Sequence, residues 1–137
     1  MIDTQEIRIR ANCEKQMLEF VLRDFSQQQD DVIPILTGPT ASGKSSLALQ
    51  WCELGNRDLI SADSMQIYRG FDIGTAKATV AEQESISHHL IDIKNADEQY
   101  SVAQFVDDAS NILHQGKTEG NKFLICGGTG QYISALV

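Results

Sequence analysis

The feature that most constrains this chain is the stretch at residues 38–45, which reads Gly-Pro-Thr-Ala-Ser-Gly-Lys-Ser. The apolar run at residues 32–36 predicts a short buried strand before it, and residues 46–52 predict a helix after it. A strand, the pattern G-x-x-x-x-G-K-S and a helix in this order are typical of a phosphate-binding loop. The expected phosphate-binding residues are Gly38, Pro39, Thr40, Ala41, Ser42, Gly43, Lys44 and Ser45.

Such a loop attracts anions for electrostatic reasons. Its glycines let several backbone N–H groups point inward, and the helix N-terminus adds roughly half a positive charge. Lys44 supplies a cation for the outer phosphate, and the Ser45 hydroxyl can hold Mg²⁺, the cofactor that we expect. The expected ligand is therefore a phosphorylated small molecule, either a nucleotide such as ATP or another diphosphate.

The rest of the chain alternates between strand and helix patterns. Further strands are expected at residues 57–61, 88–93 and 122–126, helices at 101–114 and from 131 onward, and an irregular, partly helical segment at 65–78. This alternation indicates an α/β fold with a parallel sheet flanked by helices. Because ligands bind at the carboxyl ends of such strands, we expect Gly38, Asp63 and Thr129 to converge on one crevice.

Composition narrows the class of protein. With 137 residues the chain forms one domain at most, and its net charge of −8 argues against this stretch alone gripping a nucleic-acid backbone. The three cysteines have no C-x-x-C spacing, so we expect reduced thiols and no zinc site. No apolar run is long enough for a membrane span, and the N-terminus lacks a secretory pattern. The expected location is the cytoplasm.

The strand beside the phosphate loop constrains the chemistry. Nucleoside triphosphate hydrolases and kinases usually place an acid at the end of that strand. Here the matching strand ends in Gly127-Gly128-Thr129, without an acid. A reaction in which diphosphate leaves fits better, with Lys44 and Mg²⁺ stabilising it and Asp63 accepting a proton from the nucleophile. A plain turn or cap role for Asp63 is the alternative.

Several motifs together resemble the tRNA dimethylallyltransferase (tRNA isopentenyltransferase) family. They are the phosphate loop, Ser-Ala-Asp-Ser-Met-Gln-Ile-Tyr-Arg-Gly at 61–70, Asp-Ile-Gly-Thr-Ala-Lys at 72–77, His-His-Leu-Ile-Asp at 88–92 and Gly-Gly-Thr-Gly-Gln-Tyr at 127–132. The resemblance runs from about residue 32 to the last residue. The phosphate loop alone is widespread, whereas the run from Asp63 to Lys77 is specific.

The resemblance implies transfer of a dimethylallyl group from dimethylallyl diphosphate to N6 of an adenine beside the anticodon of a tRNA. In that family the phosphate loop holds the prenyl diphosphate, here with Lys44 and with Ser45 near Mg²⁺. Asp63 would take the N6 proton, and Thr129 would help to hold the amine. The tRNA anticodon stem-loop would contact Asp63, Ser64, Met65 and Gln66.

Family members are about twice as long as this chain. We therefore expect residues 1–31 to be an N-terminal extension, an amphipathic helix plus linker, and residues 32–137 to be a partial P-loop transferase domain. Its transferase activity is expected to be weak or absent, and its exposed sheet edge is expected to favour self-association. The alternatives are a cytokinin-type adenylate prenyltransferase, a small-molecule kinase using ATP, and a non-catalytic phosphate-binding remnant.

Four further positions within these motifs carry more limited expectations. Arg69 and Lys77 are either phosphate contacts or solvated surface cations. His88 and His89 are expected to be structural, because neighbouring residues of a strand face opposite sides of the sheet.

Overall fold

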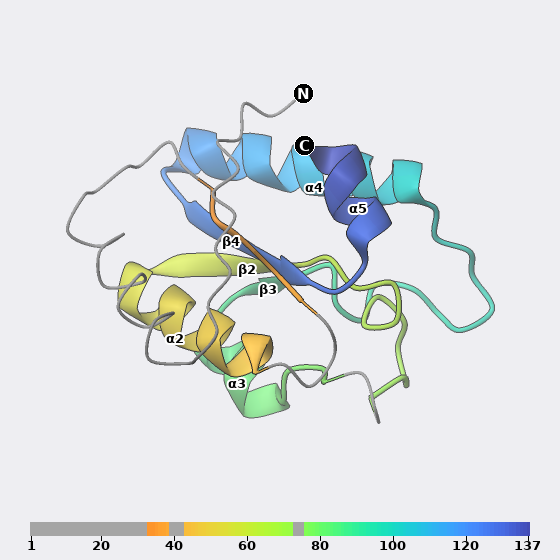
Figure 1. Ribbon diagram of the computed structural model, residues 1–137, viewed down its shortest axis with the longest axis horizontal. Helices are drawn as coiled ribbons and strands as arrows, with labels where there is room; N and C mark the ends of the chain where they lie inside the picture. Colours follow the sequence, from red (N-terminus) through yellow and green to blue (C-terminus); the bar gives the residue numbers. More distant parts are fainter. Residues whose placement is uncertain (1–32, 39–42, 73–75) are drawn as a thin grey trace.

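The computed structural model describes residues 33–38, 43–72 and 76–137. The expected N-terminal helix and the loop residues Pro39, Thr40, Ala41 and Ser42 lie outside these ranges. Figure 1 shows the described elements arranged around a central sheet. They are β1 (Ile35–Thr37), α2 (Lys44–Gly55), β2 (Arg57–Ser61), α3 (Val80–Ser85), β3 (His88–His89), α4 (Val102–Glu119), β4 (Lys122–Gly127) and α5 (Gly130–Leu136).

The described strands form one parallel sheet in the order β1-β4-β2-β3. β4 lies in the interior of the sheet. Its sequence is apolar without alternation, because both of its faces are covered. Thr37 of β1 pairs with Gly127, and Ser61 of β2 pairs with Cys126, so three strands end at the same edge. The expected parallel α/β sheet is confirmed, and so is the convergence of the three strand ends.

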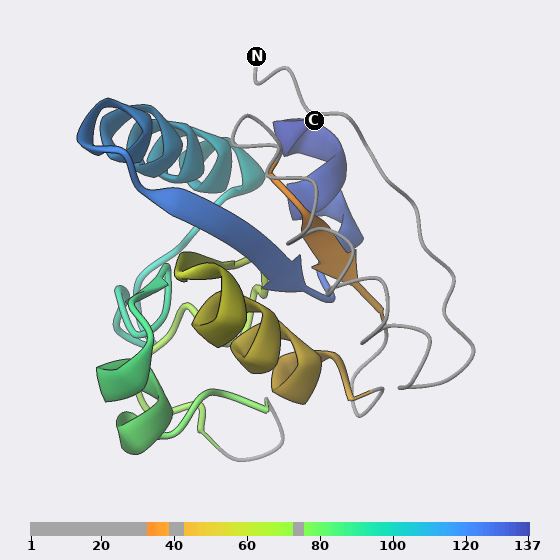
Figure 2. The same cartoon turned by 90° about the vertical axis from the view of Figure 1, so that its left-hand side faces the viewer.

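Side chains of β4 alternate between two layers of helices. Phe123 and Ile125 pack with α4 and α5 on one face, whereas Leu124 and Cys126 pack with α2 on the other. Figure 2 shows α4 and α5 on one side of β4 and α2 and α3 on the opposite side. The sheet is therefore enclosed by helices, and its carboxyl edge is the place where the loops gather. None of the described helices is long and apolar enough to cross a membrane.

Two helices differ from their expected extent. α4 continues to Glu119, beyond the expected end at residue 114, and stops at Gly120, whose φ of +79° suits glycine. α3 was not expected, although its Thr79 and Glu82 form a capping box of the T-x-x-E type. Hydrophobic periodicity does not reveal α3, because the helix is short and has no buried residue.

The strand expected at residues 88–93 is much shorter in the structure, where only His88–His89 pairs with β2. The reason is local backbone geometry, because Leu90 and Asp92 have φ values of +63° and +55°, which no strand accommodates. The chain turns toward the loop after β2 instead. There the N–H of Asp92 donates to the Gln66 carbonyl at 3.1 Å.

Candidate functional site

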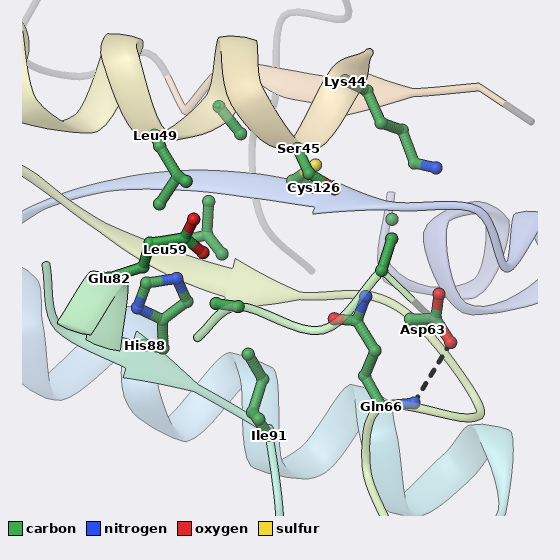
Figure 3. Close-up of a pocket in the computed structure, with 14 residues that line it drawn as sticks. Lys44, Ser45, Leu49, Leu59, Asp63, Gln66, Glu82, His88, Ile91 and Cys126 are labelled. Carbon is green, nitrogen blue, oxygen red and sulfur yellow. Dashed lines mark hydrogen bonds between the residues drawn. The ribbon is translucent and has the colours of Figure 1, made fainter. Parts of the chain in front are cut away.

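One pocket lies at the carboxyl edge of the sheet, as Figure 3 shows. Lys44 and Ser45 reach it from the first turn of α2, Asp63 and Gln66 from the turn after β2, and Gly127 from the end of β4. About 440 Å³ of space, part of it open to solvent, lies between these side chains. The structure therefore brings the expected cation and the expected acid to the same cavity.

The described part of the phosphate loop meets the turn after β4. Gly43 precedes α2 with φ +82°, a conformation that a side chain would strain. A Cβ built on Gly128 would lie 3.3 Å from the carbonyl oxygen of Gly38 and 3.8 Å from Lys44 Nζ. The glycine turn after β4 thus lies directly against the Lys44 ammonium.

Asp63 is both a turn residue and a pocket residue. Its Oδ1 accepts hydrogen bonds from the backbone N–H of Met65 at 2.8 Å and of Gln66 at 3.2 Å. Both of these bonds use the same oxygen. In Figure 3 the other carboxylate oxygen points toward the side of the pocket where Lys44 lies. Asp63 is therefore a turn residue, as the alternative proposed. The same two hydrogen bonds also fix the orientation of its carboxylate in the pocket.

Thr129 connects this turn to the turn after β4. It occupies the cap position of α5, yet its side chain makes no cap hydrogen bond, unlike the capping side chains of Thr79 and Ser101. Its Oγ1 accepts from the Ser64 N–H at 2.9 Å and donates to Ser64 Oγ at 3.3 Å. The hydroxyl is therefore held beside Asp63 and not along its own helix.

The same two turns are in backbone contact. A Cβ on Gly127 would lie 2.2 Å from the carbonyl oxygen of Ala62, closer than any side chain permits. The N–H of Thr129 also donates to that carbonyl at 3.2 Å. Because the contacts involve main-chain atoms, the relative position of Asp63 and Thr129 is set by the sheet.

Gln66 is oriented by a buried hydroxyl that the sequence analysis did not single out. Ser61 is only 1% exposed, and its Oγ donates to Gln66 Oε1 at 2.8 Å. Of the expected tRNA-contact residues, Asp63, Ser64 and Gln66 are partly buried, whereas Met65 is 48% exposed. The Met65 side chain therefore lies on the surface beside the pocket.

Charge on both sides of the pocket acts on Cys126. Burial raises the pKa of the Cys126 thiol to about 11; the Lys44 ammonium lowers it and the Asp63 carboxylate raises it. The lysine and the aspartate thus flank the same buried sulfur. The thiol itself is neutral at ordinary pH and is no nucleophile.

The Lys77 side chain is neither solvated nor a pocket residue. It is 4% exposed, and its ammonium donates to the Tyr68 carbonyl at 2.9 Å, to Asp72 at 2.8 Å and to Asp92 at 2.5 Å. Burial lowers the pKa of Lys77, but the hydrogen bonds to both carboxylates outweigh it and the pKa is raised. The Asp92 carboxylate is thus bound by Lys77. Arg69 is exposed and donates to Asn95 Oδ1 at 2.9 Å.

His88 and His89 face opposite sides, as expected. His89 Nε2 lies 3.1 Å from Asp58 Oδ2 and its ring packs edge-on against Phe123, so it is structural. His88, in contrast, lines the pocket, together with Glu82 of α3. Sequence analysis missed both pocket residues. Strand alternation predicts only that the two histidines face opposite sides of the sheet, and not that a cavity lies on one of these sides.

Comparison with known proteins agrees with these motifs. A family model described as IPP transferase matches residues 66–137, more than half of the chain. The tRNA dimethylallyltransferase of Leuconostoc citreum is 50% identical over 105 residues, which cover 77% of this chain and 36% of that protein. That of Protochlamydia amoebophila is 41% identical over 136 residues, covering 98% of this chain and 39% of that protein.

A solved structure shows the same fold. The full-length tRNA isopentenylpyrophosphate transferase from Bacillus halodurans matches with a TM-score of 0.70 and 42% identity, covering 77% of this chain and 35% of that one. The chain thus spans a little over a third of the length of these relatives. The family model, the sequence identities and the shared fold together show that the chain belongs to the IPP transferase family.

Proposed function

We propose that this chain supplies the diphosphate-binding and proton-accepting part of a tRNA dimethylallyltransferase. The reaction moves a dimethylallyl group from dimethylallyl diphosphate to N6 of an adenine next to the anticodon. The observation that carries the proposal is the shared pocket, in which the Lys44 cation and the Asp63 carboxylate lie at the same strand edge. The names of the relatives, tRNA dimethylallyltransferases, support the same reaction.

The Lys44 side of the pocket suits a leaving diphosphate. As the allylic C1–O bond breaks, negative charge builds on the diphosphate, and a fixed ammonium beside it stabilises that charge. Ser45 offers a hydroxyl in the same pocket, and such an oxygen donor, together with phosphate oxygens, suits Mg²⁺. When bound, the ion would neutralise part of the diphosphate charge.

Asp63 and Thr129 suit the attacking amine. The exocyclic nitrogen of adenine is a weak nucleophile, because its lone pair is delocalised into the ring. Asp63 accepts its proton while the new C–N bond forms, and the turn N–H groups on Oδ1 keep the carboxylate oriented. Thr129 Oγ1, held by Ser64, is placed to hold the amine. The adenine must leave its stack to arrive there, which is easiest in a loop.

The turn after β2 is the proposed contact for the tRNA loop. It presents the exposed Met65 side chain, and Ser64 and Gln66 lie partly buried on either side. An apolar side chain on the surface beside the acid can pack on the unstacked base or its neighbour. The chain carries a net charge of −8, so we expect its affinity for tRNA to be weak.

The end of β4 favours this reaction over phosphoryl transfer from ATP. β4 lies next to β1 and ends at Gly127, which abuts Ala62 and is followed by Gly128. The acid that would hold Mg²⁺ at this place in a kinase is missing from the sequence there.

Ligand binding tests the proposal. Isothermal titration calorimetry with Mg²⁺ should show binding of dimethylallyl diphosphate, weakened at least about 10-fold by Lys44→Ala through loss of a charge-assisted contact. Arg69→Ala removes an equal charge outside the pocket and should leave binding unchanged. Tight ATP binding without binding of the prenyl diphosphate would contradict the proposal and favour a kinase.

Transfer to an acceptor tests the second half. The chain alone should transfer dimethylallyl groups weakly or not at all to an anticodon stem-loop, and AMP as acceptor separates this reading from an adenylate prenyltransferase. Any residual transfer should fall by about 100-fold in Asp63→Asn, which keeps an acceptor for the turn N–H groups but removes the base.

Self-association belongs to the same proposal. β1 is an edge of the sheet in the described residues, and a strand edge offers unpaired N–H and C=O groups to a second copy. Size-exclusion chromatography with light scattering should show a concentration-dependent dimer or larger species. A monomer at all concentrations would contradict it.

A further inference from the structure

One buried hydroxyl has no part in the chemistry proposed above. Ser61 is the last residue of β2, pairs with Cys126 in the sheet and is 1% exposed. Leu59 and Cys126, which share this face of the sheet, belong to the apolar layer under α2. A hydroxyl in such a layer costs free energy unless it is hydrogen-bonded. Ser61 Oγ donates to Gln66 Oε1 at 2.8 Å, so this buried bond ties the Gln66 side chain to β2.

The main chain of Gln66 is held separately from its side chain. Its N–H donates to Asp63 Oδ1 at 3.2 Å, and its carbonyl oxygen accepts from the Asp92 N–H at 3.1 Å. With the backbone fixed in this way, the remaining freedom is rotation of the side chain and of its terminal amide. The Ser61 hydroxyl restricts both rotations, because it holds the oxygen end of the amide.

The nitrogen end of the same amide is consequently turned away from Ser61. In Figure 3 it lies on the Asp63 side of the amide, and both residues line the pocket. An amide nitrogen carries two hydrogens and donates, and one of them is enough to serve a ligand. A single turn thus presents to the pocket a carboxylate that accepts and an amide that donates.

This combination of acceptor and donor matches one edge of adenine. The N6 amine is a donor, and the ring nitrogens beside it, N1 and N7, are acceptors. A protein that reads adenine with one amide side chain accepts from N6–H and donates to N7. Here Asp63 accepts from N6, so the Gln66 amide has the donating part. If the amide were reversed, its oxygen would face a ring nitrogen, and two acceptors would repel each other.

We propose that Ser61 is a positioning residue for base selection. It holds the Gln66 amide so that Nε2 donates to a ring nitrogen beside N6 of the acceptor adenine, N1 or N7. Ser61 itself lies beneath the pocket surface and acts through Gln66. The inference rests on the proposed function, since it concerns the adenine whose N6 proton Asp63 accepts.

Nucleoside binding to the 137-residue chain tests this. NMR titration suits weak binding, and Mg²⁺ with inorganic diphosphate is present to fill the phosphate loop. The probes are adenosine, inosine, and 1-deazaadenosine and 7-deazaadenosine, in which C–H replaces N1 or N7. One of the two deaza compounds should bind about 10-fold more weakly than adenosine, the effect of one lost hydrogen bond, and it identifies the nitrogen. If both bind as adenosine does, the inference is wrong.

Substitutions at the two ends of the hydrogen bond locate the effect. Gln66→Glu still accepts from the Ser61 hydroxyl but has an oxygen in place of Nε2, so the ratio between adenosine and its deaza analogue should fall to about 1. Ser61→Ala keeps Gln66 but releases its amide, and the ratio should fall to about 3 or less. Ser61→Cys, a weak donor of similar size, should give an intermediate ratio. Ser101→Ala is the control, because its hydroxyl caps α4, and the full ratio should remain.

The ratio separates base recognition from a structural role. If Ser61→Ala weakens every nucleoside by one factor and keeps the ratio, the hydroxyl only stabilises the turn and the inference is wrong. If adenosine is preferred to inosine while both deaza compounds bind as adenosine does, the inference alone fails. If adenosine and inosine bind equally, or adenosine does not bind, the acceptor half of the proposed function fails as well. Thermal melting by circular dichroism establishes that each variant is folded before its binding is compared.

Discussion

Two parts of the pocket are held in place by different kinds of interaction. The acid side, where Asp63 and Thr129 lie, is fixed by main-chain contact between the ends of β2 and β4, at Ala62 and Gly127. Another part of the lining, Ala76 and Ala78, is held through Lys77, which lies between these two alanines in the chain. The relative position of Asp63 and Thr129 thus rests on the sheet, whereas the wall at Ala76 and Ala78 depends on one buried ammonium and two carboxylates.

Gly127→Ala should have the largest effect. The added methyl group would overlap main-chain atoms of Ala62 that have no rotamer to change, so we expect a loss of about 3 kcal/mol in the free energy of unfolding. Urea denaturation measures it. Gly130→Ala is the control, because a Cβ there meets open space and the loss should be under about 0.5 kcal/mol. Similar values for the two variants would show that the main-chain contact is not what fixes the acid side.

Lys77→Met should have a smaller effect, centred on the pocket wall. It keeps the length of the apolar stem but removes three hydrogen bonds, leaving the Tyr68 carbonyl and Asp92 without their donor. We expect a loss of about 2 kcal/mol, less than for a fully buried pair because Asp72 is 68% exposed.

Hydrogen exchange adds a positional test of the same variant. The amides that donate between segments 66–69 and 92–94 should exchange faster, while amides of β4 stay protected; they are those of Arg69, Asp92, Ile93 and Lys94. Uniformly faster exchange in β4 and in the loops would mean that the strand ends and the segment around Lys77 unfold as one unit. It would then be wrong to treat them as separately stabilised parts of the pocket.

Thr129→Val tests the contribution of one hydroxyl to the contact between the turns after β2 and β4. It removes the acceptor of the Ser64 N–H and should cost about 1 kcal/mol. Thr79→Val removes a hydroxyl of another kind, the helix cap of α3, and should cost a similar amount. Only the first variant should alter adenine transfer or binding. Equal effects of both variants on function would argue against a role of Thr129 at the amine.

The smallest expected effect is on the reactivity of the Cys126 thiol, on which both Lys44 and Asp63 act. Since burial raises the pKa of Cys126 to about 11 from the usual 9.0, the folded state resists thiolate formation. The contribution of this thiol to stability is constant below pH 9.0 and falls as the pH rises toward 11. Alkylation of Cys126 by iodoacetamide should therefore be slow at pH 8, and slower in Lys44→Ala, which removes the lowering charge. Rapid alkylation at pH 8 would mean that this side of the pocket opens readily.

Much of the fold followed from local patterns. The apolar run of β4 and the phosphate-loop motif define a parallel sheet, and the rule that its strand ends converge placed Asp63 near Lys44 before any coordinates. The contacts that hold the site are long-range and were out of reach. Lys77 finds Asp92 fifteen residues away, and the positive φ of Leu90 ends a strand that its composition favours. The pocket role of His88 depends on a cavity, which no periodicity describes.

Asp63 and Thr129 are 66 positions apart in the chain, yet they are juxtaposed by neighbouring strands alone. Parts of the intervening chain line the pocket, as Gln66, Glu82 and His88 do. Only segments away from the pocket can therefore vary in length without changing the geometry of the site. The exposed turn at residues 95–99, before α4, is the natural place for such variation. A few glycines and serines inserted there should cost only loop entropy. Homologues or engineered variants could therefore carry a new segment at this turn, even a small inserted domain, without moving the Asp63 and Thr129 side chains.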